Sequence, residues 1–326
     1  MRNLHKAYYK DYFKDIDFNY LLLGEDIKRE RNENRKRKLK RELEEIEKDN
    51  ETKIKSKNNT LSGNKLLSLI NNPISPQEHR FSLKIAYPGL VTGVGINHEA
   101  KIEGEFKLGI HFDYTWGMPV VYGSSVKGIL RAYFTEFHKR ESYEFDEFDL
   151  LHDIFYGETR NIALEKEFYK KKYQKECQEE CKKEFGDGWQ DKWEAIWTER
   201  YENNWENRWM EEVKDNDKKR KYIPKSIYDR DIFFDAVITQ TDSKGRILCS
   251  DSITPHGDNP LKNPIPLTFL KIAPGCTMEF RFKLVDTKDE NGIVIFNKDD
   301  KKALFEEIIK TVGVGAKTNV GYGQFE

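Results

Sequence analysis

The sequence predicts an α+β fold, and two kinds of pattern lead to that expectation. In the first, apolar and polar residues alternate as they do in half-buried strands, over residues 81–86 and 101–114. Further strand-like runs occupy residues 231–240, 246–250, 265–273 and 277–285. In the second, residues 299–312 read as a helix with one apolar face, formed by Ala303, Leu304, Ile308 and Val312. Because these segments lack the regular spacing of βαβ units, a doubly wound parallel sheet is not expected.

The N-terminal part, residues 1–80, is expected to extend a domain that occupies residues 81–326. From Glu25 to Thr60 it mixes both charges densely with few apolar residues, so it cannot bury enough surface to fold alone. We interpret it either as a solvated helix with charge pairs three or four residues apart, or as a mobile arm. Its basic run, RKRKLKR, has the charge to touch nucleic acid, but a solvated helix face is the better interpretation.

Residues from about 161 to 225 interrupt the strand pattern and predict an inserted helical hairpin that turns at Gly186 and Gly188. Aromatic residues recur every four positions in its second half and define a stripe along one expected helix: Trp189, Trp193, Trp197, Tyr201, Trp205 and Trp209. Because tryptophan is usually buried, we expect this stripe to pack against the partner helix or the parent domain. The alternative is an interface for another protein.

The composition excludes several classes of protein. The 326 residues carry a net charge of −1, so any nucleic-acid binding needs a local basic patch. No segment has the apolar core of a signal peptide or a membrane span, so a cytoplasmic location and no membrane partner are expected. The four cysteines are too few for a disulfide framework: Cys177, Cys181, Cys249 and Cys276. Since only the first two have a spacing suited to a shared metal, no metal site is expected.

The stretch GMPVVYGSSVKGILRAYF predicts a turn followed by an amphipathic helix. Its apolar positions, three and four residues apart, are Val126, Ile129, Leu130, Tyr133, Phe134 and, just beyond it, Phe137. Gly123 supplies the tight turn, and Ser124 or Ser125 stands where the helix needs a cap. The first-turn amides would face an anion, and Lys127 and Arg131 add two cations on one side. We interpret the motif as a phosphate-sized site; the plainer alternative is a capped, solvated helix.

The stretch GVGAKTNVGYGQF holds four glycines in a GxGxxxxxGxG pattern: Gly313, Gly315, Gly321 and Gly323. A dinucleotide-binding fingerprint or a P-loop must open a helix, whereas the sequence stops at Glu326. Lys317 and Thr318 give the KT of a P-loop, but Ala316 stands where that loop needs glycine. We therefore expect the loop to present its amides to something that runs across a sheet surface, and an extended nucleic-acid backbone has that geometry.

Together the two motifs resemble those of the RAMP superfamily of CRISPR proteins. GMPVVYGSSVKGILR is similar to the turn-to-helix motif of that superfamily, and GVGAKTNVGYGQF to its C-terminal glycine-rich loop. The order of YPGLVTGVG, the GSSVKG helix, FFDAVI, SDSITPHGDNP, NPIPLTFLKIAPGCTMEFRF and the glycine loop is similar to the family of sixth subunits of type III-B (Cmr) effector complexes. The resemblance covers residues 81–325 without the helical insertion. The charged arm and the tryptophan-rich insertion depart from it, so their roles do not carry over.

The resemblance implies a ferredoxin-like or RRM-like RAMP domain with a four-stranded antiparallel sheet. It implies a non-catalytic subunit of a type III-B ribonucleoprotein that binds guide (CRISPR) RNA and target RNA near the 3′ end of the guide. Its implied partners are other Cmr-complex subunits, especially the RAMP subunit of the backbone filament that it caps in antiviral defence. No cofactor is implied. The implied RNA-binding residues are Gly123, Ser124, Ser125, Lys127, Arg131, Gly313, Gly315, Lys317, Thr318, Asn319 and Gly321.

A catalytic role is the main alternative, namely a RAMP-type metal-independent endoribonuclease that processes guide RNA. Such cleavage needs a base near the 2′-hydroxyl, and His256 is the first candidate because its loop also holds Asp251 and Asp258. Asp235 interrupts an apolar strand and is a candidate for burial, although a strand aspartate more often secures a turn or an arginine. A loop histidine beside a carboxylate is more often structural, and no hydrolytic signature appears. A third hypothesis is a stand-alone protein-interaction module that uses the tryptophan stripe.

Overall fold

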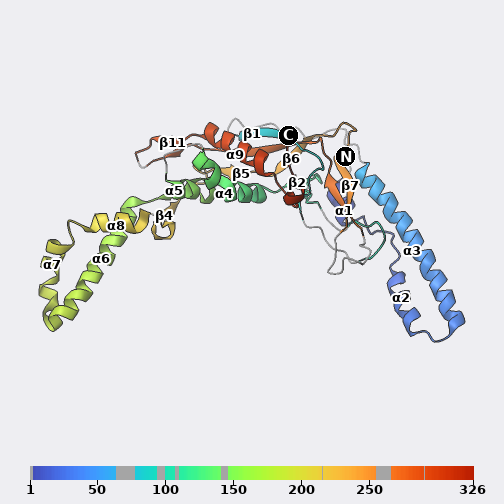
Figure 1. Ribbon diagram of the computed structural model, residues 1–326, viewed down its shortest axis with the longest axis horizontal. Helices are drawn as coiled ribbons and strands as arrows, with labels where there is room; N and C mark the ends of the chain where they lie inside the picture. Colours follow the sequence, from blue (N-terminus) through green and yellow to red (C-terminus); the bar gives the residue numbers. More distant parts are fainter. Residues whose placement is uncertain are drawn as a thin grey trace. The chain divides into compact units, whose positions relative to one another are not determined.

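The structure is a computed structural model that describes residues 3–63, 78–93, 100–106, 110–140, 146–214, 216–254, 266–289 and 291–326. The chain folds into two compact units (Figure 1). The first contains Met1–Phe137, Ile232–Leu284 and Asp299–Glu326. The second contains His138–Asp231 and Val285–Lys298. Helices and antiparallel strand pairs make up both units, so the α+β prediction is confirmed.

The first unit is built on one antiparallel sheet. Its main path follows the order β1, β9, β6, β2, which are Glu78–Lys84, Thr277–Lys283, Ala236–Gln240 and Val120–Val121. A short strand, β5 (Ile232–Phe233), pairs with β9 just before β6 begins. At the end of the chain, Phe325 forms an antiparallel bridge with Ile85, and the Glu326 N–H donates to the Lys84 carbonyl at 2.8 Å. The last residues therefore run beside the end of β1.

The helices complete a ferredoxin-like arrangement. α4 (Gly123–Arg140) lies between β1 and β6 in the chain, and α9 (Lys298–Val312) lies between β9 and the terminal bridge. The order is thus β1, α4, β6, β9, α9 and a final strand position, which is the β-α-β-β-α-β order of ferredoxin-like folds. β2 is an added edge strand beside β6. The expected fold is confirmed, with its last strand reduced to one bridge.

One face of this sheet carries the aromatic core, because alternate side chains of a strand point to the same face. Phe280 and Phe282 of β9 are fully buried, and the Phe81 ring of β1 stacks on both at centroid distances of 5.3 and 5.6 Å. α9 contributes Phe305, whose ring lies 5.5 Å from that of Phe282. The Phe233 ring of β5 lies 5.8 Å from the rings of both Phe282 and Phe305. α9 therefore covers the aromatic face.

Both helices lie where the sequence predicts them, but their buried faces differ slightly from the expected stripes. α4 buries Val126, Leu130, Phe134 and Phe137, whereas Tyr133 is exposed. α9 buries Leu304, Phe305, Ile308 and Ile309, while Ala303 is exposed and Val312 half-buried. The bulky side chains of α9 thus decide which face meets the sheet, because they bury more apolar area than alanine can.

Residues 101–106 and 110–114 do not form the predicted strand, although their apolar side chains are buried: Ile102, Phe106, Ile110 and Phe112. Gly104 has a φ of 77°, and the Glu105 N–H donates to the Ile102 carbonyl, so the chain turns there. The hydroxyl of Tyr12 accepts the Phe106 N–H at 2.9 Å, and the two rings stack. Alternating burial arises here from contacts with the N-terminal segment and not from a strand ladder.

The other predicted strands are present, including the antiparallel pair β7 (Leu248–Ile253) and β8 (Leu267–Ile272).

The N-terminal part forms α1 (Leu4–Tyr9), α2 (Asn19–Arg29) and α3 (Glu33–Ser62) (Figure 1). α3 confirms the solvated-helix interpretation, since charge pairs such as Lys53 with Asp49 lie four residues apart at 2.5 Å. Its buried residues are Asn50, Ile54 and Leu61. The segment before it is different, because Leu4, Tyr8 and Tyr12 are almost fully buried. Leu4, Tyr8 and Tyr12 therefore belong to the core of the first unit.

The second unit contains the helical hairpin. α6 (Ile162–Phe185) ends at Gly186, and the 3-10 helix η2 (Gly186–Asp191) leads into α7 (Trp193–Arg200) and α8 (Trp205–Lys214). The aromatic stripe is not on one helix as predicted, because residues 201–204 turn between α7 and α8. Its members still pack on the partner helix: Trp197, Trp205 and Trp209 share a buried cluster with Tyr169, Tyr173, Cys177 and Cys181 of α6. The packing interpretation is therefore confirmed.

The rest of the second unit comprises α5 (Glu147–Leu151), η1 (His152–Tyr156), β3 (Glu158–Arg160), η3 (Asp217–Lys219), β4 (Tyr222–Pro224), β10 (Thr287–Lys288) and β11 (Val294–Phe296).

Arg220 anchors the base of the hairpin through two ion pairs. The buried Arg220 Nη1 lies 2.6 Å from the Asp146 Oδ1 and 3.0 Å from the Asp149 Oδ1. Burial alone would raise the pKa of Asp146, but the hydrogen bond and ion pair with Arg220 outweigh it and lower that pKa.

Candidate nucleic-acid interface

The start of α4 is fixed by a residue that is distant in sequence. The strand that carries FFDAV breaks between β5 and β6, and in that break the exposed Asp235 accepts the Gly123 N–H through Oδ1 at 2.7 Å. A Cβ on Gly123 would lie 2.3 Å from the Phe233 carbonyl oxygen, so only glycine fits. Asp235 thus secures a turn as expected, but it is exposed and not buried. The first amide of the helix is occupied by protein.

The serines do not make the expected cap. The N–H groups of Ser125 and Val126 both donate to the Tyr122 carbonyl, at 2.8 and 3.0 Å. Ser124 and Ser125 are exposed at the helix start, and the Ser124 N–H meets no protein acceptor within the part of the chain that the structure describes. The hydroxyls and this amide are therefore turned toward solvent at the positive end of the helix dipole.

The two cations of the motif lie one turn further along α4. Lys127 is half-buried, and its Nζ lies 5.9 Å from the centroid of the Phe233 ring. Arg131 is exposed. Because Phe233 also packs on α9, Lys127 is placed beside the helix from which the glycine-rich tail departs. Of the two predicted cations, Lys127 is therefore linked to α9 through the Phe233 ring.

The tail glycines are required by the fold itself. Gly313 ends α9 with a φ of 78°, and a Cβ there would lie 2.5 Å from the Gly323 carbonyl oxygen. A Cβ on Gly323 would lie 1.8 Å from the Val314 carbonyl oxygen, and one on Gly315 would lie 2.3 Å from that of Val91. The spacing that looks like a phosphate cradle therefore lets three segments of backbone approach one another. Its explanation needs no ligand.

The middle of the tail is the part that faces outward. Lys317 adopts a left-handed conformation with φ 62°, and the 3-10 turn η4 (Thr318–Val320) follows and ends at Gly321. Lys317 and Asn319 are exposed. Among the described residues, the N–H groups of Gly315, Lys317, Thr318 and Asn319 donate to no protein acceptor. This turn therefore offers adjacent amide donors and one lysine to solvent, which is the arrangement of an anion-binding nest.

A short segment of the first unit links the two motifs. The Ala316 N–H donates to the Val91 carbonyl at 2.7 Å, which attaches the tail to it. The next residue, Thr92, accepts the His111 N–H through its hydroxyl oxygen at 2.7 Å. The His111 ring in turn stacks on Tyr122, which directly precedes the helix start. The tail is thus attached directly to Val91, whereas the α4 motif is connected to the same segment through His111 and Tyr122.

Sequence reasoning missed the residues that make this link. Thr92, His111 and Tyr122 lie near the motifs in sequence or within them, yet none belongs to the glycine, serine and lysine pattern. Tyr122 stands inside the turn-to-helix motif, but its exposure could not be predicted from the sequence. The hydrogen bond from the Gly123 N–H to Asp235 had no signal either, since pairing between distant segments is not visible in a linear pattern.

The proposed general base lies outside the described residues. His256 and Asp258 are in residues 255–265, so no geometry tests their role. The third member of that group, Asp251, bonds to Lys271 and accepts the Tyr322 hydroxyl at 3.0 Å. Burial would raise the pKa of Asp251, but the hydrogen bonds from Lys271, the Ser252 amide and Tyr322 lower it. Asp251 therefore orients the tail through Tyr322.

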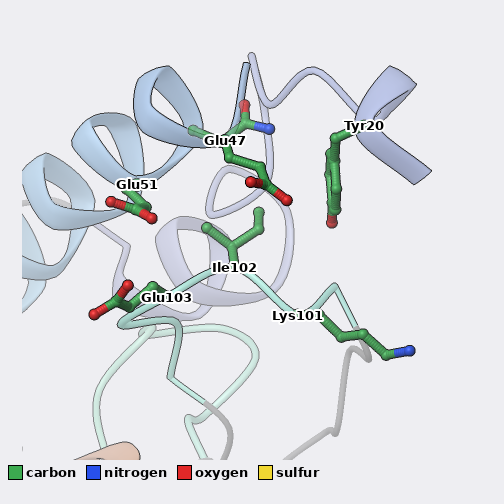
Figure 2. Close-up of a pocket in the computed structure, with 7 residues that line it drawn as sticks. Tyr20, Glu47, Glu51, Lys101, Ile102 and Glu103 are labelled. Atoms are coloured by element: carbon green, nitrogen blue, oxygen red, sulfur yellow. The ribbon is translucent and has the colours of Figure 1, made fainter. Parts of the chain in front are cut away.

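The cavity shown in Figure 2 has the wrong charge for RNA phosphates. It has a volume of about 190 Å³ and is lined by Tyr20, Glu47, Asn50, Glu51, Lys101, Ile102 and Glu103. In Figure 2, Glu51 and Glu103 lie on one side of it, with Tyr20 and Lys101 on the other. Because three carboxylates face one lysine, phosphate oxygens are repelled there. The cavity is separate from both motifs.

The cysteines of the hairpin are part of its packing. Cys177 and Cys181 lie within the aromatic cluster, and burial raises the pKa of the Cys177 thiol to about 11. Within the described ranges, no three His, Cys, Asp or Glu side chains gather as metal ligands would. None of the helices in the described part of the chain combines the length and the apolar character that a membrane span needs.

Comparisons with known proteins bear on most of the chain. The model of a family described as the RAMP superfamily matches residues 82–326. No curated protein matches the sequence. Among solved structures, a type III-B Cmr-beta complex bound to cognate target RNA contains a chain with 16% identity and a TM-score of 0.41, over 98% of this chain and 92% of that chain. Cmr6 from Pyrococcus furiosus gives 18% identity and a TM-score of 0.29, over 76% of this chain and 97% of that chain. The likenesses to these two structures are too weak to bear on the site.

Proposed function

The chain belongs to the RAMP superfamily, and from that premise we propose that it is a non-catalytic RNA-binding subunit of a type III-B CRISPR ribonucleoprotein effector complex. It binds the backbones of guide RNA and target RNA near the 3′ end of the guide and caps the filament of RAMP subunits. The order of sequence motifs supports the subunit, and the family supports the class of ligand.

The observation that carries the proposal is the connection between the two motifs: the tail is bonded to Val91, and the next residue, Thr92, holds His111, whose ring stacks on Tyr122 just before α4. The turn at Lys317 and the start of α4 each leave main-chain N–H groups without a protein acceptor in the described part of the chain, and each has a cation nearby. Amides and cations on one surface bind phosphates without reading sequence. The proposed backbone contacts are therefore made by Ser124, Lys127 and Arg131 of α4, and by residues 315–319 of the tail.

The salt dependence of binding tests the site. For single-stranded RNA, the slope of log affinity against log salt concentration falls by about 0.7 for each phosphate that the protein no longer neutralises. Replacing Lys127, Arg131 and Lys317 together by alanine should therefore lower the slope by about 2, measured by fluorescence anisotropy with a labelled single-stranded RNA. Lys183→Ala removes an exposed lysine of α6 and serves as the control. An unchanged slope in the triple variant would contradict the site.

The assembly is tested in the cell. Expression of the chain with its genomic neighbours, followed by purification through a tag on it, should recover small RNA and the other subunits. The triple variant should recover less RNA with the same yield of protein. A preparation that carries neither RNA nor partner subunits contradicts the proposed function.

A further inference from the structure

We propose that Tyr122, backed by His111, is a platform on which one nucleobase of the bound strand stacks. This inference rests on the proposed function, because it assumes that the strand lies along the two motifs. It goes further by assigning a base contact to a surface that would otherwise hold only backbone. The ligand class is single-stranded RNA with an unpaired base at this position.

The ring pair is rigid. The centroids of His111 and Tyr122 lie 4.9 Å apart with an interplanar angle of 28°. The backbone of His111 is fixed on both sides, since its main-chain N–H donates to the Thr92 hydroxyl and its carbonyl accepts the Val120 N–H at 2.9 Å. The His111 ring packs against Gly93, where a Cβ would lie only 2.4 Å from the ring Nε2. Burial lowers the pKa of His111, which favours the neutral ring. The Tyr122 side chain therefore rests on a fixed support, and little entropy is lost when a base stacks on it.

The position of Tyr122 also suits a base. Its side chain is 38% exposed although its backbone is locked by the helix start that follows. The exposed serines and the cations of α4 follow Tyr122 directly in the chain, and the segment to which the tail is attached contacts its His111 support. A strand whose phosphates contact both motifs passes over this ring, and aromatic stacking accepts any base because every base has a π-face.

The size of the effect distinguishes a platform from an ordinary surface tyrosine. Loss of one stacked base lowers affinity by about 5- to 150-fold. Loss of an exposed tyrosine that contacts no ligand leaves affinity unchanged. Because stacking carries no charge, loss of the platform leaves the salt slope as it is, in contrast to loss of Lys317.

The test measures binding of the full chain to two RNAs of about eight nucleotides, one intact and one without bases, by fluorescence anisotropy. Wild-type protein should prefer the intact RNA. Tyr122→Phe should keep that preference, whereas Tyr122→Leu, which keeps bulk without a π-face, should reduce it by about 5-fold or more with an unchanged salt slope. Circular dichroism of both variants checks the fold.

Two outcomes overturn the inference while leaving the proposed function intact. In the first, Tyr122→Leu keeps the wild-type preference for the intact RNA. In the second, Tyr122→Leu weakens binding to both RNAs equally, which indicates a structural role. If the wild-type chain binds neither RNA, the proposed function fails together with the platform.

Discussion

Asp235→Asn should strengthen RNA binding if the start of α4 receives a phosphate. The exposed carboxylate accepts the Gly123 N–H and so places a negative charge at the helix end where the phosphate would lie. Asparagine keeps a side-chain oxygen at that position, so the hydrogen bond remains while the charge is lost. The change therefore separates the electrostatic role of Asp235 from its role as a cap.

The size of the gain follows from Coulomb's law. Two unit charges about 4 to 8 Å apart in a solvent-exposed setting repel each other by about 0.5 to 1 kcal/mol. Removing the charge should therefore raise affinity by about twofold to fivefold at low salt, and the gain should shrink as salt screens the pair. Stability should change little because the cap remains.

The assay is fluorescence anisotropy with a labelled single-stranded RNA at several salt concentrations. Asp235→Ala removes both charge and cap, so it should bind RNA more tightly as well but unfold more easily, by about 0.5 to 2 kcal/mol. Asp187→Asn removes an exposed carboxylate of η2 and is the matched control. An unchanged or weaker affinity for Asp235→Asn, beside an unchanged control, refutes the placement of a phosphate at this helix end.

Three further predictions concern the tail, the hairpin and catalysis. Gly323→Ala should lower the melting temperature far more than Gly104→Ala. Both glycines have a positive φ, 72° and 77°, but only a Cβ on Gly323 would collide with backbone. Equal losses of melting temperature in the two variants would contradict this reasoning. Because the folded pKa of Asp146 lies below its usual range, its ion pair with Arg220 stabilises the fold above about pH 4 and is lost as pH falls further. Asp146→Asn should therefore flatten stability against pH in that range, measured by thermal melts, and a parallel curve counts against it. Incubation with repeat RNA and a chelator should give no cleavage, whereas cleavage abolished by His256→Ala would establish the endoribonuclease alternative.

Local patterns were sufficient to place most elements. Alternation located β1, β6 and β9, and the spacing of apolar residues located α4 and α9. These signals work because burial repeats every second residue in a strand and every three or four in a helix. The same signal failed at residues 101–114, where burial alternates without a ladder, since Tyr12 holds Phe106 from outside the segment.

Only part of the candidate site could be predicted from the sequence. The glycines and cations of both motifs are local features, and the outward turn at Lys317 is where the pattern suggests it. The contacts that require glycine at these positions come from distant segments. Asp235 accepts the Gly123 N–H, and the Val91 carbonyl lies too close to Gly315 for any Cβ. The serines suggest a cap because caps are predicted from local sequence, yet the side-chain oxygen that accepts a helix-start N–H is that of the distant Asp235.

By itself the sequence determined the α+β class, the positions of the main helices and strands, and the two motifs that identify the superfamily. Only the tertiary structure decided which amides remain free for a ligand among the described residues, and that the two motifs are linked through Val91, Thr92 and His111. The physical reason is the range of the interactions involved. Helix and strand patterns depend on neighbours within a few residues, whereas hydrogen bonds between the tail, the strand break and the Thr92–His111 pair join segments that only the packed sheet brings together.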